Sequence, residues 1–379
     1  MKKKLLILVN DLGFFISHRF PIAEAAIDKG FDVVIAYGEN ENVDLNLLKQ
    51  KRMSTYLVPM YRGGINPFNE LKTFYYIWKL FKKERPDIVH LVSIKPYLYG
   101  GIISRLSGIS AVVSAISGLG SLFTTKNLIS RILRILIHPL YKFSFNHKNQ
   151  KVILQNKDDV KLLLEQKVLD ASNITLIKGS GVKLENFNNL DENVGVLNVC
   201  FAARLIREKG VNEFVSAARI LKERGVDARF ILAGSIDLKN PSGLNEEELK
   251  NLNKENILEI VGYHQDIRDL YAKSHIVCLP SYREGFPKSL IEAAAACRAI
   301  VTTNVAGCRE AIIPGQTGLL VPVKNPKKLA DAIQWLIEHP EQRIAMGRAG
   351  RKFAEKEFAI EKIVRQHLDI YEELLNKVK

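Results

Sequence analysis

Two glutamates, Glu284 and Glu292, stand eight residues apart in a stretch whose pattern suits ligand binding, residues 276–311. An apolar run ending at Pro280 is followed by a polar turn, an alanine-rich helix and a second apolar run over Ala299–Thr303. This order is typical of a βαβ unit in a parallel sheet, whose ligands lie beyond the carboxyl ends of the strands. Carboxylates at such a place suit the hydroxyls of a sugar or a ribose. The alternative for Glu284 is a surface loop position favoured by the helix dipole.

The start of the alanine-rich helix is predicted to bind an anion. Pro287 suits the first helical turn, where a missing N–H costs nothing. The backbone N–H groups around it lack partners within the helix and favour phosphate. They belong to Phe286, Lys288, Ser289 and Leu290.

A second candidate anion site lies in residues 202–210, between a predicted strand and a predicted helix. Arg204 suits bidentate contact with phosphate and Lys209 a point-charge contact. Both loops open on the same edge of a parallel sheet, so the two sites together suit a diphosphate; the alternative is a pair of solvated loop cations. The sequence has no DxD triad, His/Cys cluster or P-loop, so we expect no carboxylate-bound metal. Arg204, Lys209 and the helix N–H groups would then neutralise a leaving diphosphate.

Length and composition predict a globular protein of two domains. The 379 residues suffice for two cores, and 47% apolar with 25% charged residues are ordinary values for a soluble protein. We expect no signal peptide, because the apolar run after Met1 is short, and no membrane-spanning segment. The cysteines show no CxxC pairing, so reduced cytosolic thiols are expected rather than disulfides or zinc ligands. They are Cys200, Cys278, Cys297 and Cys308.

The net charge of +14 is concentrated in the first half of the chain. Residues 1–190 contain 27 Lys and Arg against 15 Asp and Glu, whereas residues 191–379 contain 28 against 26. Between Asp87 and Asp158 there is no acidic residue and there are nine basic ones. This imbalance predicts an anionic partner for the first half: lipid headgroups, a phosphorylated substrate or nucleic acid.

Strand and helix patterns alternate in both halves, which predicts two parallel α/β domains. Strands are expected at Lys4–Asn10, Phe31–Tyr37, Ile88–Val92, Ala111–Ala115, Val152–Gln155, Leu197–Ala202, Arg229–Ala233, Ile257–Val261 and Ile276–Leu279. Helices are expected at Phe20–Lys29, Asn66–Lys83, Val211–Arg224, Ile267–Lys273, Pro326–Glu338, Gln342–Phe353 and Ile360–Lys377. The polar segment Asn186–Gly195 is interpreted as the interdomain linker. The first turn, Asn10–Ser17, lacks GxGxxG, which argues against a dinucleotide-binding dehydrogenase.

A basic amphipathic helix is predicted over Leu128–Phe145. Its stripe of basic side chains lies beside Leu, Ile and Phe, a pattern that can lie in an anionic membrane surface. The alternative is a core-packed helix with a solvated basic face. The stripe consists of Arg131, Arg134, His138 and Lys142.

Several segments resemble retaining glycosyltransferases of family 4. Residues 284–293, EGFPKSLIEA, match the family's E-x7-E motif, and residues 203–210, ARLIREKG, match its donor-phosphate loop. Residues 178–187 resemble its interdomain segment, and residues 10–19 resemble the start of its acceptor domain. Together these segments occur in the family's order over nearly the whole chain.

The resemblance implies the GT-B fold, with two facing Rossmann-like parallel-sheet domains and a cleft between them. Residues 1–188, with a last helix from about 360 to 379, would bind the acceptor, and residues 189–359 the nucleotide sugar. Arg204 and Lys209 would hold the donor phosphates, Glu284 the transferred sugar and Glu292 the ribose. Further donor contacts would come from Gly13, Gly262, Tyr263, Gly285, Phe286, Pro287, Lys288, Ser289 and Leu290.

Within the family, residues 117–120 and the SYREGFP and AGCREA segments resemble transferases that add N-acetylhexosamine to diphospho-undecaprenol-linked sugars. A UDP-sugar donor, such a lipid-linked saccharide acceptor and an anionic membrane surface are therefore the expected partners, at the inner face of the cytoplasmic membrane. No cofactor or metal is expected. Many relatives have His where this chain has Ser117, so His18 is a candidate contact for the acceptor hydroxyl; the alternative is an ordinary loop histidine. The candidate acceptor residues are His18, Arg19, Lys95, Ser117, Gly118, Arg131 and Arg134.

Two rival functions follow from the same residues. A GT-B transferase could use a soluble acceptor, although such an acceptor would not need an acid-free basic half. A pI of 9.4 also suits a nucleic-acid-binding protein. The basic stretch holds no recognised nucleic-acid module, and binding to nucleic acid would leave the paired glutamates unexplained, so no nucleic-acid partner is expected.

Overall fold

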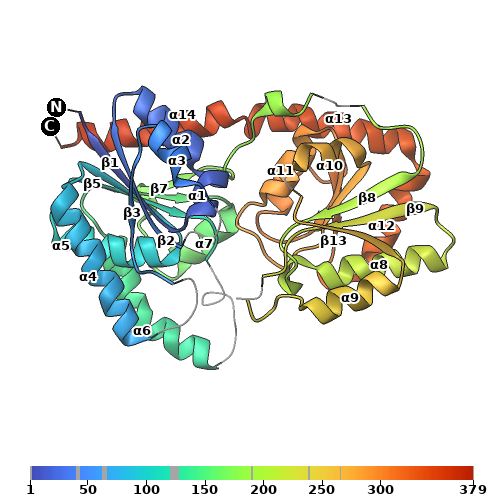
Figure 1. Ribbon diagram of the computed structural model, residues 1–379, viewed down its shortest axis with the longest axis horizontal. Coiled ribbons are helices and arrows are strands. Elements are labelled where there is room, and N and C mark those ends of the chain that lie inside the picture. Colours follow the sequence, from blue (N-terminus) through green and yellow to red (C-terminus); the bar gives the residue numbers. More distant parts are fainter. Residues whose placement is uncertain are drawn as a thin grey trace. The chain divides into compact units, whose positions relative to one another are not determined.

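Two parallel sheets, each covered by its own helices, organise the chain (Figure 1). Contacts divide it into unit 1, Met1–Ser180 with Glu361–Lys379, and unit 2, Gly181–Ile360. The computed structural model describes residues 2–39, 43–61, 66–119, 128–188, 191–237, 240–264 and 266–378, with the backbone alone at 128–134 and 136. The predicted α/β class with two Rossmann-like parallel sheets is confirmed.

The described residues of unit 1 form a seven-stranded sheet in the order β3-β2-β1-β4-β5-β6-β7. Its strands are β1 (Lys4–Asp11), β2 (Asp32–Glu39), β3 (Ser54–Leu57), β4 (Ile88–Val92), β5 (Ala111–Ile116), β6 (Gln150–Leu154) and β7 (Ile174–Leu176). The order reverses between β1 and β4. Ligands of open α/β sheets bind beyond the carboxyl ends of the strands at such a reversal.

Successive side chains of the strands in unit 1 point to opposite faces of the sheet and enter two separate cores. Leu6 and Leu8 pack with the helices of one face, which are α4 (Pro67–Glu84), α5 (Gly101–Leu106), α6 (Leu128–Ser144) and α7 (Lys157–Glu165). Leu5 and Ile7 pack with those of the other face, which are α1 (Leu12–His18), α2 (Phe20–Asp28), α3 (Leu45–Gln50) and α14 (Ile360–Asn376). The last helix of the chain therefore completes the core that begins with its first strand.

The described residues of unit 2 form a six-stranded sheet in the order β10-β9-β8-β11-β12-β13. Its strands are β8 (Leu197–Ala202), β9 (Ala228–Ala233), β10 (Leu258–Gly262), β11 (Ile276–Leu279), β12 (Ala299–Thr303) and β13 (Gly318–Val321). Its helices are α8 (Val211–Glu223), α9 (Glu246–Lys254), α10 (Ile267–Lys273), α11 (Lys288–Ala295), α12 (Pro326–Glu338) and α13 (Pro340–Glu357). Here the order reverses between β8 and β11, so the loops after these two strands are neighbours.

Two local predictions need correction. The chain enters unit 2 at Gly181 rather than after residue 188, because Val182 already pairs with Ala359 of that unit in a β-bridge. The change in composition near 186–195 therefore falls inside unit 2 and not between the units. The turn predicted at residues 10–17 instead contains helix α1, which begins because the Asp11 carboxylate accepts a hydrogen bond from the Phe14 N–H at 2.6 Å.

Two properties of the described residues complete the fold. All four cysteines are buried and unpaired. None of the helices in the described ranges combines the length and the apolarity that a membrane crossing requires.

Candidate active site

The loops after β8 and β11 interlock at the strand-order reversal of unit 2. Gly210 lies at φ +78°, and a Cβ at this position would stand 2.1 Å from the Pro280 carbonyl oxygen. The Tyr282 N–H and the Ser281 hydroxyl both donate to the Glu208 carbonyl oxygen, at 2.8 and 2.9 Å. Only glycine fits such a left-handed position with so close a neighbour. The backbone therefore holds the two candidate anion-binding loops in fixed register.

Lys209 and Glu284 form an ion pair that joins these two loops. The Glu284 side chain is 9% exposed and that of Lys209 is 20% exposed. The pair lies beside the buried Cys308 thiol, whose pKa is raised to about 12 by burial and further by the Glu284 charge. Glu284 is thus a largely enclosed carboxylate with a specific cationic partner.

A third loop, after β12, lies directly against the backbone that carries Glu284. Gly307 lies at φ +73°, and a Cβ there would stand 2.4 Å from the Gly285 carbonyl oxygen and 2.8 Å from that of Glu284. No larger residue fits without moving one of these carbonyls. The AGCREA segment, which the sequence analysis singled out, therefore packs against the Glu284 backbone and helps to fix its position.

Arg204 and Lys209 contact different carboxylates. The Arg204 Nη1 atom lies 2.6 Å from Asp237 Oδ2, in the loop after β9. Sequence reasoning missed Asp237, whose only signal is its place after a strand next to β8. Both candidate phosphate-binding cations are thus paired in this structure, Lys209 with little exposure and Arg204 with its side chain 44% exposed.

The start of α11 differs in detail from the prediction. The helix begins at Lys288, and Pro287 is the extended N-cap residue (φ −75°, ψ 118°) rather than part of the first turn. The Leu290 N–H, predicted to be unpaired, donates to the Pro287 carbonyl oxygen at 3.2 Å. No described side chain caps the helix start, and Phe286 packs its ring on Phe358 at 5.4 Å. Lys288 and Ser289 thus supply the first two helical N–H groups.

Glu292 lies one turn further along α11, with its side chain 14% exposed. Burial raises the pKa of this carboxyl, and the Lys288 ammonium, 3.4 Å from Oε1, works in the opposite direction. A carboxylate held in an apolar setting with one cation nearby is a strong acceptor for hydroxyl groups.

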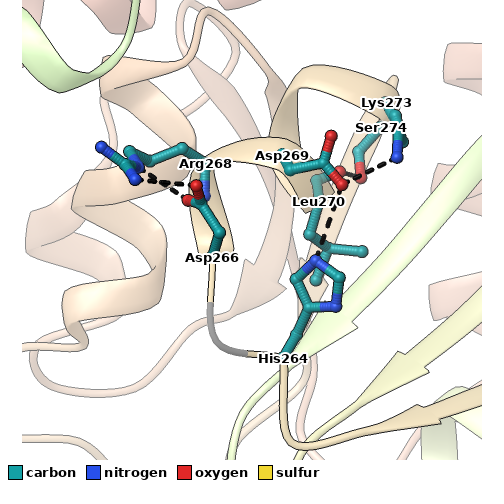
Figure 2. Close-up of polar contacts among 7 residues, drawn as sticks. All are labelled: His264, Asp266, Arg268, Asp269, Leu270, Lys273 and Ser274. Carbon is teal, nitrogen blue, oxygen red and sulfur yellow. Dashed lines mark hydrogen bonds and ion pairs between the residues drawn. The ribbon is translucent and has the colours of Figure 1, made fainter.

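The loop after β10 presents Gly262 and Tyr263, two of the predicted donor contacts. Gly262 turns the chain at φ +64°, and Tyr263 beyond it is 75% exposed. Figure 2 shows how the loop ends: Asp266 accepts the Arg268 N–H at 3.0 Å and pairs with its guanidinium at 2.6 Å. Arg268 holds the pKa of Asp266 down at about 2. This cap fixes the start of α10. The Tyr263 ring, before it in the chain, is open to solvent.

Four predicted residues lie beyond the carboxyl ends of strands in unit 1. Gly13 follows β1 within α1, Lys95 follows β4, and Ser117 and Gly118 follow β5. Because the sheet is parallel, these positions share one edge. The Lys95 ammonium lies 2.6 Å from the Glu70 carboxylate.

The backbone on both sides of Lys95 has an unusual conformation that the sequence did not predict. Ser93 lies at φ +80°, a conformation that non-glycine residues rarely adopt, and Pro96–Gly100 form a π-helical turn. Both features are typical of functional sites. Neither leaves a signal in the sequence, since Ser93 is neither Gly nor Asn.

His18 and Arg19, both predicted to contact the acceptor, differ in exposure. The His18 ring stacks on Phe14 at 4.1 Å and bonds Ser17 Oγ through Nδ1 at 2.7 Å. Arg19 is only 1% exposed, and its electrostatic neighbours are His90, His367 and Tyr371. Its guanidinium therefore belongs to the core under α14, which corrects the prediction of an acceptor contact.

The remaining predictions concern α6 and metals. The side chains of Arg131 and Arg134 lie outside the described residues. His138, in the same predicted stripe, is half-buried and donates from Nε2 to the Gln166 carbonyl oxygen at 2.7 Å. Among the residues the structure describes, no group of three or more His, Cys, Asp or Glu side chains could hold a metal ion.

Two family models match consecutive parts of the chain. Residues 4–156 match glycosyl transferase 4-like proteins, and residues 182–353 match glycosyl transferases group 1. A similar protein from Campylobacter jejuni is N,N'-diacetylbacillosaminyl-diphospho-undecaprenol alpha-1,3-N-acetylgalactosaminyltransferase, 28% identical over 98% of this chain and 99% of the relative. Another, from Escherichia coli, is UDP-Gal:alpha-D-GlcNAc-diphosphoundecaprenol alpha-1,3-galactosyltransferase, 25% identical over 71% of this chain and 73% of the relative.

Solved structures match over the same length. A glycosyltransferase from Rickettsia africae superposes with a TM-score of 0.76, at 22% identity and 99% coverage of both chains. Sucrose-phosphate synthase from Thermosynechococcus elongatus gives 0.78 at 19% identity, covering 99% of this chain and all of the other. These likenesses show the GT-B fold. With a glycosyl transferase 4-like region followed by a group 1 region, the chain belongs to the family 4 glycosyltransferases of the GT-B fold.

Proposed function

We propose that this glycosyltransferase moves N-acetylhexosamine, GalNAc or GlcNAc, from a UDP-sugar to a saccharide on a polyprenyl diphosphate, with retention of configuration. The C. jejuni relative, named for such a transfer, supports the acceptor class because it aligns with nearly the whole chain. A UDP donor is supported by the fold neighbour HepE of Anabaena, solved with UDP and with UDP-glucose.

The observation that carries this proposal is the enclosed Lys209–Glu284 pair between the interlocked loops of unit 2. An incoming diphosphate would draw Lys209 and Arg204 toward its oxygens, since phosphate competes well for paired cations. Glu284 would then accept hydrogen bonds from the hydroxyls of the transferred sugar. Glu292 would accept from the ribose hydroxyls, and the start of α11 would face the phosphates.

The transfer needs no protein nucleophile in this scheme. The acceptor hydroxyl attacks the anomeric carbon from the face that the diphosphate leaves, so the new C–O bond forms as the old one breaks. The hydroxyl proton passes to the departing diphosphate oxygen. Arg204, Lys209 and the helix N–H groups stabilise the charge that develops on UDP, the part a metal ion plays in other transferases.

The acceptor would lie at the carboxyl edge of the sheet in unit 1, near Lys95, Ser117 and Gly118. The basic excess of residues 1–190 suits a diphosphate lipid in an anionic membrane. The enzyme would therefore work at the inner face of the cytoplasmic membrane, bound to its surface in part through α6.

One experiment tests the substrate assignment directly. The protein is incubated with a panel of UDP- and GDP-sugars and polyprenyl-diphosphate-linked saccharides, and products are identified by mass. The proposal requires an added N-acetylhexosamine from the UDP donors, an α-linkage by NMR, and unchanged turnover in EDTA. A product formed only with a soluble acceptor would contradict the acceptor class, and a β-linkage would contradict retention.

A further inference from the structure

Helix α4 presents large apolar side chains to solvent along one face. Phe68 is 83% exposed, Leu71 69%, Tyr75 53% and Trp78 43%. Their spacing of three, four and three residues places them on one stripe of the helix. The opposite face is buried in unit 1, so α4 has two apolar sides and only one of them has a partner within the described residues. A contiguous apolar face of this kind marks an interaction site.

The charges beside the stripe are positive. Lys72, Lys79 and Lys82 are exposed on α4. Its two acidic residues are turned to partners within unit 1: Glu70 accepts from Lys95 and Tyr99, and Glu84 from Lys4 and Tyr56. The outer face therefore combines aromatic rings with lysines and carries no unpaired carboxylate.

This composition suits one occupant, an anionic lipid surface. Tyr and Trp prefer the headgroup region of a bilayer, and lysines beside them attract anionic lipids. A second copy of the chain fits less well, because two such faces would bring their lysine rows together. We propose that α4 lies in the interface of an anionic membrane, with Phe68, Leu71, Tyr75 and Trp78 toward the acyl chains.

Neighbouring helices lie on the same side of unit 1 as α4. α4 packs against α5 and α5 against α6, and Figure 1 shows the three on one side of unit 1. On α6, Ile135 is 67% exposed and Phe143 38%. The inference deepens the proposed function, since it names the part of unit 1 that would meet the membrane holding the lipid-linked acceptor. It does not depend on the identity of the sugar.

Tryptophan fluorescence tests the proposal, because the chain contains only Trp78 and Trp335. Trp335→Phe leaves Trp78 on α4 as the sole fluorophore, and Trp78→Phe leaves Trp335 in unit 2 as the matched control. With phosphatidylcholine vesicles containing phosphatidylglycerol, Trp78 emission should shift to the blue and be quenched by brominated acyl chains. Trp335 emission should not change, and pure phosphatidylcholine should give no response.

Serine substitutions give the second measurement. Phe68→Ser with Leu71→Ser should weaken sedimentation with anionic vesicles at least tenfold, and both side chains are exposed, so the fold should persist. Leu47→Ser with Val323→Ser, two exposed apolar positions elsewhere, is the control and should bind as wild type.

Three outcomes would overturn the inference. They are an absence of vesicle binding, vesicle binding without any change in Trp78 emission, and a blue shift that follows protein concentration without lipid, which would assign the face to a second copy. No acceptor is present in these assays, so failure of the proposed transfer reaction would leave their result unaffected.

Discussion

The Lys209 ammonium and the Glu284 carboxylate join the loops after β8 and β11 at the strand-order reversal of unit 2. An ion pair with so little exposure has lost much of its hydration, so each charge depends on the other. In the proposed scheme a diphosphate draws Lys209 toward its oxygens, and the hydroxyls of the transferred sugar then hydrogen-bond to Glu284. The pair would thus link binding of the donor phosphates to binding of the donor sugar.

Glu284→Gln should abolish transfer. Glutamine keeps the size of the side chain and can still accept from Lys209, but it lacks the charge that polarises the sugar hydroxyls. We expect the rate to fall at least ~100-fold, the usual effect of removing one electrostatic group from an active site. UDP binding by calorimetry and the thermal midpoint should stay close to wild type. Glu247→Gln, on the exposed side of α9, is the control, and full activity of Glu284→Gln would disprove the site.

The basic stripe of α6 should contribute to membrane binding through charge. Changing Arg131, Arg134 and Lys142 together to Glu reverses three charges, each worth ~1 kcal/mol of attraction near an anionic surface. The variant should remain in solution when anionic vesicles are sedimented, whereas wild type should pellet and release in high salt. Vesicle binding equal to wild type would remove α6 from the membrane surface.

The sequence predicted strongly patterned elements well and irregular backbone poorly. The predicted bounds of three strands agree with the observed ones: Ile88–Val92, Leu197–Ala202 and Ile276–Leu279. Continuous apolar runs between turn signals are typical of buried parallel strands. Short elements such as α3 and β13 were missed, since a few residues give no clear period. Helix α1 was not predicted, although its N-cap residue, Asp11, is of a type that favours helix starts.

The residues of the candidate site likewise include some that the sequence predicts and some that it does not. Glu284, Glu292 and Lys209 could be found because their types and spacing match a known motif. Asp237 and Gly307 could not, since their contacts with Arg204 and with the Glu284 backbone depend on loops that meet only in the folded sheet. Arg19 was misplaced for a related reason: arginine usually lies at the surface, whereas here α14 covers it.

Acid should destabilise unit 1 through two buried histidines, His90 in β4 and His367 in α14. Burial, with the Arg19 charge, lowers the pKa of His367 from 6.5 to about 3, so the unfolded chain binds a proton that the folded chain excludes. Stability should therefore be full above pH 6.5 and fall as the pH drops toward 3, by up to ~1.4 kcal/mol per pH unit. His367→Gln should flatten this slope in urea unfolding followed by Trp78 fluorescence, with Trp335→Phe present in both proteins. Equal slopes for wild type and variant would contradict the assignment.

Gly307→Ala should damage catalysis although Gly307 contacts no substrate in the proposed scheme. Its Cβ would meet the Gly285 carbonyl at 2.4 Å, and relief of that clash must move the backbone that holds Glu284. Gly315→Ala is the matched control, because Gly315 has nearly the same φ, +76° against +73°, but nothing within 4 Å of an added Cβ. Both variants should lose the ~1–2 kcal/mol that a left-handed alanine costs. Only Gly307→Ala should also lose at least ~10-fold in kcat, since small displacements of a catalytic group are costly. Equal kcat values in the two variants would show that Gly307 acts through stability alone and does not position Glu284.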